Sequence, residues 1–214
     1  MAIRAVVFDL DGTLLDTEKL YKRFWLEAAH RLGYPMREEH ALMIRSMAAE
    51  KAGPLLRREV CPAFDYPAVR ALRREMMEAF IDEHGVDPKP GMIKTLTALR
   101  ERGFLLGLAT ATPPERVEKY LKMAGADGLL DAIACASMVP HGKPAPDIYL
   151  LACEKLGVAP EEAMAVEDAP SGILAAHAAG LHPVLIPDQD EPGEEIAALS
   201  EAVVKSLLDV PGLL

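Results

Sequence analysis

Residues 5–13 read Ala5-Val6-Val7-Phe8-Asp9-Leu10-Asp11-Gly12-Thr13, a short apolar run that ends abruptly in an acidic turn. Continuous rather than alternating hydrophobicity is typical of a strand that is covered on both faces, as in a parallel sheet. Asp9 and Asp11 are two positions apart, so on an extended chain both carboxylates face the same side and could converge on one ligand. Gly12 permits the sharp turn by which the backbone leaves the strand.

Similar apolar runs recur along the rest of the chain. They occupy residues 104–109, 132–135, 163–166 and 183–186. Helical patterns lie between them at about 92–102, 114–124, 147–156 and 171–179, and each is followed by a glycine suited to a helix C-terminus. This alternation of strand and helix predicts an α/β fold, a doubly wound parallel sheet of the Rossmann-like kind.

The interval between the first and second strands breaks this alternation. It shows helical patterns near 19–32, 38–50 and 67–84, punctuated by Pro54, Pro62 and Pro67. We therefore expect residues 1–16 and 88–214 to form the α/β core domain. Residues 17–87 are expected to form an inserted, all-helical cap domain.

Composition excludes several classes of function. The net charge of -10 argues against binding to nucleic-acid backbones and disfavours docking on anionic lipid. Nothing before Asp9 resembles an export signal, and no apolar stretch approaches the roughly 18 residues of a membrane helix. Three widely spaced cysteines are expected to be reduced thiols in a cytoplasmic protein. A small anionic substrate stays compatible, because a metal or a few local cations can reverse the field inside a cleft.

Two further polar residues could belong to a site, one at the end of a predicted strand and one on a loop. Thr110 ends the second strand, and its hydroxyl, with neighbouring N–H groups such as that of Ala111, could bind a phosphoryl oxygen. Thr110 could equally cap the helix that starts near Pro114. Lys143 lies in the stretch 141–147, His-Gly-Lys-Pro-Ala-Pro-Asp, where a loop lysine is usually a solvated surface charge. The two prolines restrict the backbone after Lys143 and favour a positioned side chain.

Glu167 and Asp168 end the fourth strand. Either acid could simply stabilise the N-terminus of the next helix. Two adjacent carboxylates opposite a second acidic pair would, however, repel each other without a cation, and magnesium prefers such oxygen ligands. A calcium loop starting at Asp9 fits poorly, because its sixth and twelfth positions are Leu14 and Leu20 instead of Gly and Glu.

The order and spacing of these motifs resemble the haloacid dehalogenase-like hydrolase superfamily. The matching elements are D-x-D-G-T, a strand-terminal Thr, Gly-Lys-Pro-x-Pro-Asp and Glu-Asp. The helical insertion after the first motif resembles subfamily I, which has a helical cap at this point, and within it the β-phosphoglucomutase-like phosphatases. The stretches 9–18, 141–144 and 166–170 look most like those of pseudouridine-5'-phosphatases.

The resemblance implies a phosphatase that uses Mg²⁺ as cofactor and acts on a small sugar or nucleoside phosphate. Asp9 would attack phosphorus and form an aspartyl-phosphate. Asp11 would protonate the leaving alcohol and then deprotonate the hydrolytic water. Thr110 and Lys143 would bind the transferring oxygens. The metal ligands would be Asp9, the backbone carbonyl of Asp11, Asp168, and Glu167 either directly or through a water.

The resemblance also implies substrate contacts from the cap. The candidates are Arg45, Ser46, Lys51, Tyr21 and Trp25. Tyr21 and Trp25 are four positions apart and share a helical face, so both could instead be core residues. Asp16, Thr17 and Glu18 either cap the helix that begins near Lys19 or form a hinge and part of the cleft wall. Glu18 is therefore a further candidate for substrate binding.

Two other functions stay open. One is a hexose-phosphate mutase of the β-phosphoglucomutase type, although mutases of this group commonly carry His where this chain has Tyr21. The other is a non-enzymatic phospho-receiver module, although such modules lack a large helical insertion. The expected partner is a small phosphorylated metabolite, with neither nucleic acid nor membrane. The sequence leaves the oligomeric state undetermined, and a monomer is favoured.

Overall fold

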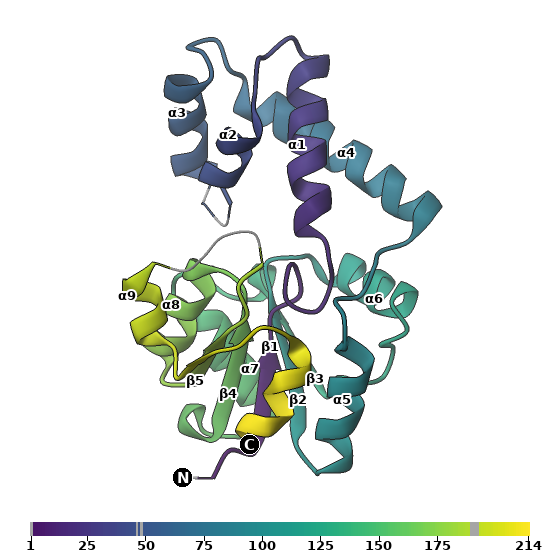
Figure 1. Cartoon of the computed structure of the whole chain (residues 1–214), viewed down its shortest axis with the longest axis vertical. Helices are drawn as coiled ribbons and strands as arrows, with labels where there is room; N and C mark the ends of the chain where they lie inside the picture. The colour runs from purple at the N-terminus through teal and green to yellow at the C-terminus, as the bar shows by residue number, and fades with distance from the viewer. Residues whose placement is uncertain (1, 46, 48, 189–192) are drawn as a thin grey trace. The chain divides into compact units, whose positions relative to one another are not determined.

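The computed structural model describes residues 2–45, 47, 49–188 and 193–214. Ser46, one of the candidates for substrate contact, lies outside these residues. The chain divides into two compact units (Figure 1). The first combines Met1–Asp16 with Val86–Leu214, and the second is Thr17–Gly85.

The first unit is built on a six-stranded sheet in which every neighbouring pair of strands is parallel. In chain order the strands are β1 (Ala5–Phe8), β2 (Leu105–Thr110), β3 (Ala132–Cys135), β4 (Ala163–Glu167), β5 (His182–Leu185) and β6 (Ala202–Val203). Every residue of β1 and β4 is buried, as expected for strands covered on both faces. The predicted doubly wound parallel sheet is confirmed, and β6 is an additional edge strand.

Helices cover both faces of this sheet. They are α5 (Met92–Glu101), α6 (Pro114–Met123), α7 (Asp147–Leu156), α8 (Pro170–Ala179) and α9 (Glu194–Leu199), with the 3-10 helices η1 (Ala136–Met138), η2 (Pro160–Glu162) and η3 (Leu207–Leu213). The helix α7 packs on β2 and β3 and against α8, whereas α5 packs against η3. In Figure 1, η3 lies in front of the strands and α7 lies behind them.

The packing of α7 follows directly from its sequence. Ile148, Ala152 and Leu156 are four positions apart, as are Tyr149 and Cys153, so all five lie on one side of the helix, and all of them are buried. Together they form part of the core between α7, α8 and the sheet. Cys153 is thus a free thiol inside the core, and Cys135 is also buried and free, while Cys61 is half-buried.

The strand order β3-β2-β1-β4-β5-β6 reverses direction between β1 and β4. Phe8 at the end of β1 lies next to Leu108 of β2 on one side and Val166 of β4 on the other. The residues that follow these positions therefore leave the sheet at one edge, side by side. In open α/β sheets this reversal is the place where ligands bind.

The second unit consists of helices over its described residues, as predicted for the insertion. These are α1 (Glu18–Arg31), α2 (Glu38–Met43), α3 (Ala49–Glu59) and α4 (Tyr66–His84). Its core includes a stacked pair, Trp25 on α1 and Tyr66 on α4, whose ring centroids are 5.5 Å apart. The helices α1 and α4 pack against each other along their lengths.

Two predictions for this unit were wrong. The single helix expected at 38–50 ends at Met43, and a separate helix, α3, begins at Ala49. Pro54, expected to interrupt helical structure, lies inside α3. A proline there removes one backbone hydrogen bond. Burial of Ala52, Gly53 and Leu56 against the rest of the unit stabilises α3 despite that loss.

The chain leaves the first unit and returns to it along two adjacent segments. The backbone N–H of Asp16 donates to the carbonyl of Asp87 at 2.9 Å, and that of Lys89 donates to the carbonyl of Leu14 at 2.8 Å. Leu15 and Pro88 form an antiparallel bridge between these hydrogen bonds. The loop that carries Asp9 and Asp11 is thereby tied to the segment that returns from the insertion. Among the described residues, no helix is both long and apolar enough to cross a membrane.

Candidate active site

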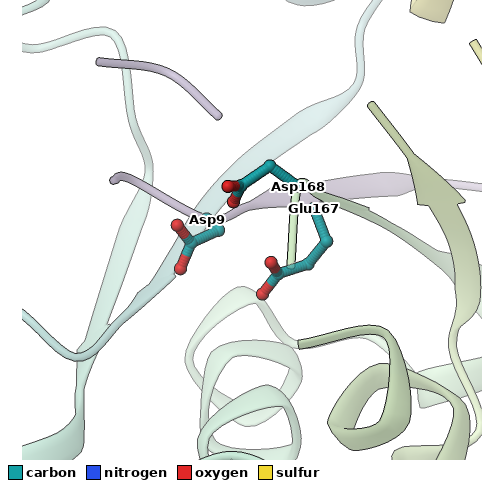
Figure 2. Close-up of side chains that lie close together, drawn as sticks. All are labelled: Asp9, Glu167 and Asp168. Carbon is teal, nitrogen blue, oxygen red and sulfur yellow. The ribbon is translucent and has the colours of Figure 1, made fainter. Parts of the chain in front are cut away.

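Three carboxylates meet where the strand order reverses. Asp9 follows β1, while Glu167 ends β4 and Asp168 comes next, and candidate ligand oxygens of the three lie within 4.8 Å of one another. Figure 2 shows their side chains grouped at the ends of the two strands. All three residues are buried. Three buried negative charges at this separation repel one another strongly, so the group requires positive charge nearby.

Lys143 supplies one such charge. Its Nζ lies 2.5 Å from Oδ1 of Asp9 and 2.5 Å from Oε1 of Glu167, and it also donates to the carbonyl of Ala109 at 2.8 Å. Only 11% of its side chain is exposed, so Lys143 is not a solvated surface lysine. Burial by itself lowers the pKa of Lys143, but the charges of Asp9 and Glu167 outweigh it and raise the pKa above its ordinary value. The ammonium therefore stays charged.

The environment of Asp9 still favours a further cation. Its backbone N–H donates to the carbonyl of Val166 at 2.9 Å, which fixes the loop at the end of β1. Burial raises the pKa of the Asp9 carboxyl; Lys143 opposes this, and the charges of Glu167 and Asp168 add to it. Three buried carboxylates with one ammonium between them leave net negative charge, and their oxygens are the ligands that hard divalent cations prefer. The residues present thus fit a divalent metal ion.

Glu167 is held by residues that the sequence did not reveal. The hydroxyl of Tyr149 on α7 donates to Oε1 of Glu167 at 2.7 Å. Burial raises the pKa of Tyr149, and the nearby charges of Glu167 and Asp9 raise it further, so this phenol stays a hydrogen-bond donor. Gly172 in the first turn of α8 makes room for the carboxylate, because a Cβ there would lie 1.9 Å from it.

Thr13, the last residue of the acidic turn, is a hydrogen-bond partner of Asp168 that we did not predict. It is almost fully buried, and its hydroxyl donates to Oδ1 of Asp168 at 3.1 Å. The hydrogen bond connects the loop after β1 to the end of β4. The position of Thr13 at the end of the D-x-D-G-T motif was the signal that could have identified this residue.

Asp11 points to a different neighbour. Its Oδ2 accepts a hydrogen bond from the hydroxyl of Thr112 at 2.6 Å. Its carboxylate does not belong to the group formed by Asp9, Glu167 and Asp168 among the described residues.

Thr110 is fully buried at the end of β2, and its hydroxyl oxygen accepts a hydrogen bond from the backbone N–H of Thr112 at 3.0 Å. The helix α6 begins at Pro114, and its N-cap residue is Pro113, which makes no side-chain capping hydrogen bond. Thr110 is therefore not the N-cap residue of this helix. Ala111 is exposed beside it.

The candidates in the second unit make contacts within that unit. Nε of Arg45 lies 3.3 Å from Oε2 of Glu18, and both side chains are largely buried. Tyr21 and Trp25 share a helical face as predicted, because the guanidinium of Arg73 lies over both rings, 4.8 and 5.3 Å from their centroids. Trp25 is a core residue and Lys51 is exposed. The helix α1 begins at Glu18, and the side chain of Thr17 does not cap it.

Comparison with known proteins agrees with this architecture. The family model for haloacid dehalogenase-like hydrolases matches residues 3–180. The chain is 32% identical to protein CbbY of Cereibacter sphaeroides, over 99% of this chain and 95% of that protein. It is 30% identical to hexitol phosphatase B of Escherichia coli K12, over 97% and 94% of the two chains.

A solved structure leads to the same family. The crystal structure of CbbY from Rhodobacter sphaeroides in complex with phosphate has a TM-score of 0.79 and 29% sequence identity. The match covers 97% of this chain and 96% of that one. A family model that spans most of the chain, together with relatives of this identity and coverage, shows that this enzyme belongs to the haloacid dehalogenase-like hydrolase family.

Proposed function

We propose that the chain is a Mg²⁺-dependent phosphatase that hydrolyses a small sugar or nucleoside phosphate through an aspartyl-phosphate on Asp9. The observation that carries this proposal is the ammonium of Lys143, held 2.5 Å from both Asp9 and Glu167 beside Asp168. Two findings on relatives support it. One relative is named hexitol phosphatase B, and the crystal structure of another contains phosphate.

Electrostatics explain why a metal belongs to the proposal. A phosphomonoester dianion cannot approach three buried carboxylates unless their charge is neutralised, and Lys143 supplies only one positive charge. Asp9, Asp168 and the backbone carbonyl of Asp11 would hold Mg²⁺, with Glu167 as a direct ligand or through a water. When bound, the ion would neutralise the carboxylates and withdraw charge from the phosphoryl oxygens.

The chain's own residues then account for both halves of the reaction. A carboxylate oxygen of Asp9 attacks phosphorus, and the bond from phosphorus to the leaving oxygen breaks as Asp11 gives that oxygen a proton. Asp11 next takes a proton from a water molecule, whose oxygen attacks the same phosphorus. The bond to Asp9 breaks, and inorganic phosphate leaves. Asp9 is regenerated as a carboxylate.

Three donors are available for the oxygens of the transferring group. The ammonium of Lys143 already lies against Asp9, where the phosphoryl group would be attached. The oxygen of Thr110 accepts a hydrogen bond from the N–H of Thr112, so its own proton is directed elsewhere and can be donated to a phosphoryl oxygen. Ala111, an exposed residue beside it, would contribute its backbone N–H group.

The test is release of inorganic phosphate, with and without Mg²⁺, from a panel of phosphomonoesters. The panel contains hexose 6-phosphates, β-glucose 1-phosphate, pseudouridine 5'-phosphate, phosphoglycolate and nucleoside monophosphates. Replacing the nucleophile in Asp9→Asn should abolish turnover. Asp127→Asn, the same substitution at an exposed turn residue, is the matched control and should retain full activity.

Four results would count against the proposal. Turnover by folded Asp9→Asn would overturn the nucleophile assignment, and turnover independent of Mg²⁺ would overturn the cofactor. Isomerised sugar phosphate without free phosphate, detected by phosphorus NMR, would replace the phosphatase with a mutase. A phosphorylated Asp9 that persists for hours without ester hydrolysis would replace it with a phospho-receiver.

A further inference from the structure

Thr112 joins two parts of the candidate site that come from different strands. Its hydroxyl donates to Oδ2 of Asp11 at 2.6 Å, and its backbone N–H donates to the hydroxyl oxygen of Thr110 at 3.0 Å. Asp11 belongs to the loop after β1, whereas Thr110 ends β2. All three residues lie in the same compact unit, and Thr112 is buried. The loop after β2 is therefore hydrogen-bonded directly to the carboxylate of Asp11.

The hydrogen bond to Asp11 has the geometry of a strong one. Its 2.6 Å separation is typical of a hydroxyl that donates to a carboxylate, which is about twice as strong as a bond between neutral groups. The donor is itself held firmly. The threonine side chain is β-branched and stiff, and its backbone N–H is hydrogen-bonded to Thr110. The next residue, Pro113, has a fixed φ angle, which restricts the backbone that follows Thr112. Thr112 thus imposes one orientation on the carboxylate of Asp11.

We propose that Thr112 is a positioning residue that aims Asp11 for proton transfer to the leaving oxygen. The inference rests on the proposed function, in which Asp11 is the proton donor. Thr112 acts through Asp11 and has no contact with phosphorus in this scheme. Proton transfer demands close and well-aligned donor and acceptor atoms, so a carboxyl group free to rotate loses much of its effect.

A purely structural role makes a different prediction. If the hydroxyl of Thr112 only stabilised the loop, its removal would slow hydrolysis of every ester to the same extent. If it aims Asp11, its removal matters most for esters whose leaving group needs a proton. Sugar and nucleoside phosphates release an alkoxide, which needs that proton, whereas p-nitrophenyl phosphate releases a stable phenolate.

The experiment therefore compares kcat/KM for two substrates, namely p-nitrophenyl phosphate and the alkyl phosphate of the panel that the wild type hydrolyses fastest. The value of kcat/KM depends only on the steps up to departure of the first product, so hydrolysis of the aspartyl-phosphate does not affect it. In Thr112→Val, kcat/KM should fall about tenfold more for the alkyl phosphate than for p-nitrophenyl phosphate. Thr112→Ser retains the hydroxyl and should keep the wild-type ratio between the two substrates.

Two further variants guard against misfolding. Thr112→Ala lacks the hydroxyl and, like Thr112→Ser, lacks the methyl group, so the Ser and Ala pair isolates the hydroxyl even if Val disturbs the loop. Thr95→Val is the matched control, because Thr95 is also buried in the same unit and its hydroxyl donates to the carbonyl of Leu207 at 2.9 Å. In this control, the ratio of the kcat/KM values for the two substrates should stay at the wild-type value.

Equal losses on both substrates in Thr112→Val and Thr112→Ala, or the same selective loss in Thr112→Ser, would overturn the positioning role while leaving the phosphatase proposal intact. No activity of the wild type on any ester would overturn the proposed function and this inference with it. The two failures are thus distinguishable.

Discussion

A Cβ atom on Gly172 would lie 1.9 Å from the carboxyl carbon and from Oε1 of Glu167. The first turn of α8 can therefore approach this buried carboxylate only with glycine at position 172. In this position Glu167 contacts both Lys143 and Tyr149. A residue that reads as an ordinary helix position in the sequence is a geometric requirement of the site.

Gly172→Ala should therefore destabilise the protein, although alanine is intrinsically better than glycine in a helix by about 1 kcal/mol. The added methyl group must displace Glu167 or the helix backbone, and such overpacking costs about 1–3 kcal/mol. Urea unfolding measures the free-energy change, and phosphate release measures the loss of activity. Gly212→Ala, where a Cβ meets nothing within 4 Å, is the control. An active Gly172→Ala of unchanged stability would contradict the steric argument.

Tyr149→Phe removes a single oxygen from the same environment. Glu167 would lose its hydrogen bond from the phenol and keep its contact with Lys143, so we expect a destabilisation of about 1–2 kcal/mol. Activity should fall because the carboxylate is less constrained. Tyr34→Phe, on a ring that packs against Phe64 in the other unit, is the matched control. Equal unfolding free energies for Tyr149→Phe and wild type would show that this hydrogen bond has no net effect.

The sheet could be predicted because strands buried on both faces must be largely apolar, as residues 5–8 and 163–166 are. The edge strand β6 could not, because Ala202–Val203 is too short to show a pattern. In the second unit, the division between α2 and α3 was also missed. Helical periodicity does not reveal that division, and Pro54 pointed to the wrong place for it.

Within the site, the positions at the strand ends were predictable, since parallel strands bring their carboxyl ends to one edge of the sheet. The expected grouping of Asp9, Lys143, Glu167 and Asp168 is what the structure contains, whereas their chemical roles stay predictions. Tyr149 could not be found, because its contact with Glu167 arises only when α7 packs on the sheet. Local sequence likewise cannot distinguish a buried loop lysine from an exposed one.

Lys143→Met tests the charge balance of the site. Without the ammonium, Asp9, Glu167 and Asp168 repel one another in a buried environment, so the variant should be less stable than wild type in the absence of Mg²⁺. Adding Mg²⁺ should raise the melting temperature of both proteins, because a ligand that binds only the folded state stabilises it. Turnover should fall about 10²-fold or more, since a donor to the transferring oxygens is lost.

Thermal unfolding with EDTA and with Mg²⁺ measures the first two effects. Lys122→Met changes an exposed lysine of α6 and should behave as wild type in both. Asp168→Asn should shrink the increase in melting temperature caused by Mg²⁺, because a proposed ligand loses its charge. An unchanged Mg²⁺ response in Asp168→Asn would argue that the ion binds elsewhere.

His182 predicts a pH dependence of stability at the sheet edge, away from the carboxylate group. Its Nδ1 is hydrogen-bonded to the carboxylate of Glu201, just before β6. Its Nε2 is hydrogen-bonded to the carbonyl of Glu161 at 3.0 Å. The hydrogen bond that His182 donates to the carboxylate of Glu201 is the main cause that raises the pKa of His182 above its ordinary 6.5, against a smaller opposing effect of burial. The folded state therefore binds this proton more tightly than the unfolded state. The resulting stabilisation is fully present below pH 6.5 and is lost as the pH rises through the higher native value.

The urea midpoint of wild type should therefore decrease from pH 6 towards pH 9 more steeply than that of His182→Gln or Glu201→Gln. In Glu201→Gln the histidine loses its charged partner, so its pKa returns towards the ordinary value and the slope flattens. Glu195→Gln removes an exposed carboxylate from the nearby α9 and should keep the wild-type slope. Parallel curves for wild type and both variants of the pair would mean that the hydrogen bond between His182 and Glu201 does not link protonation to folding.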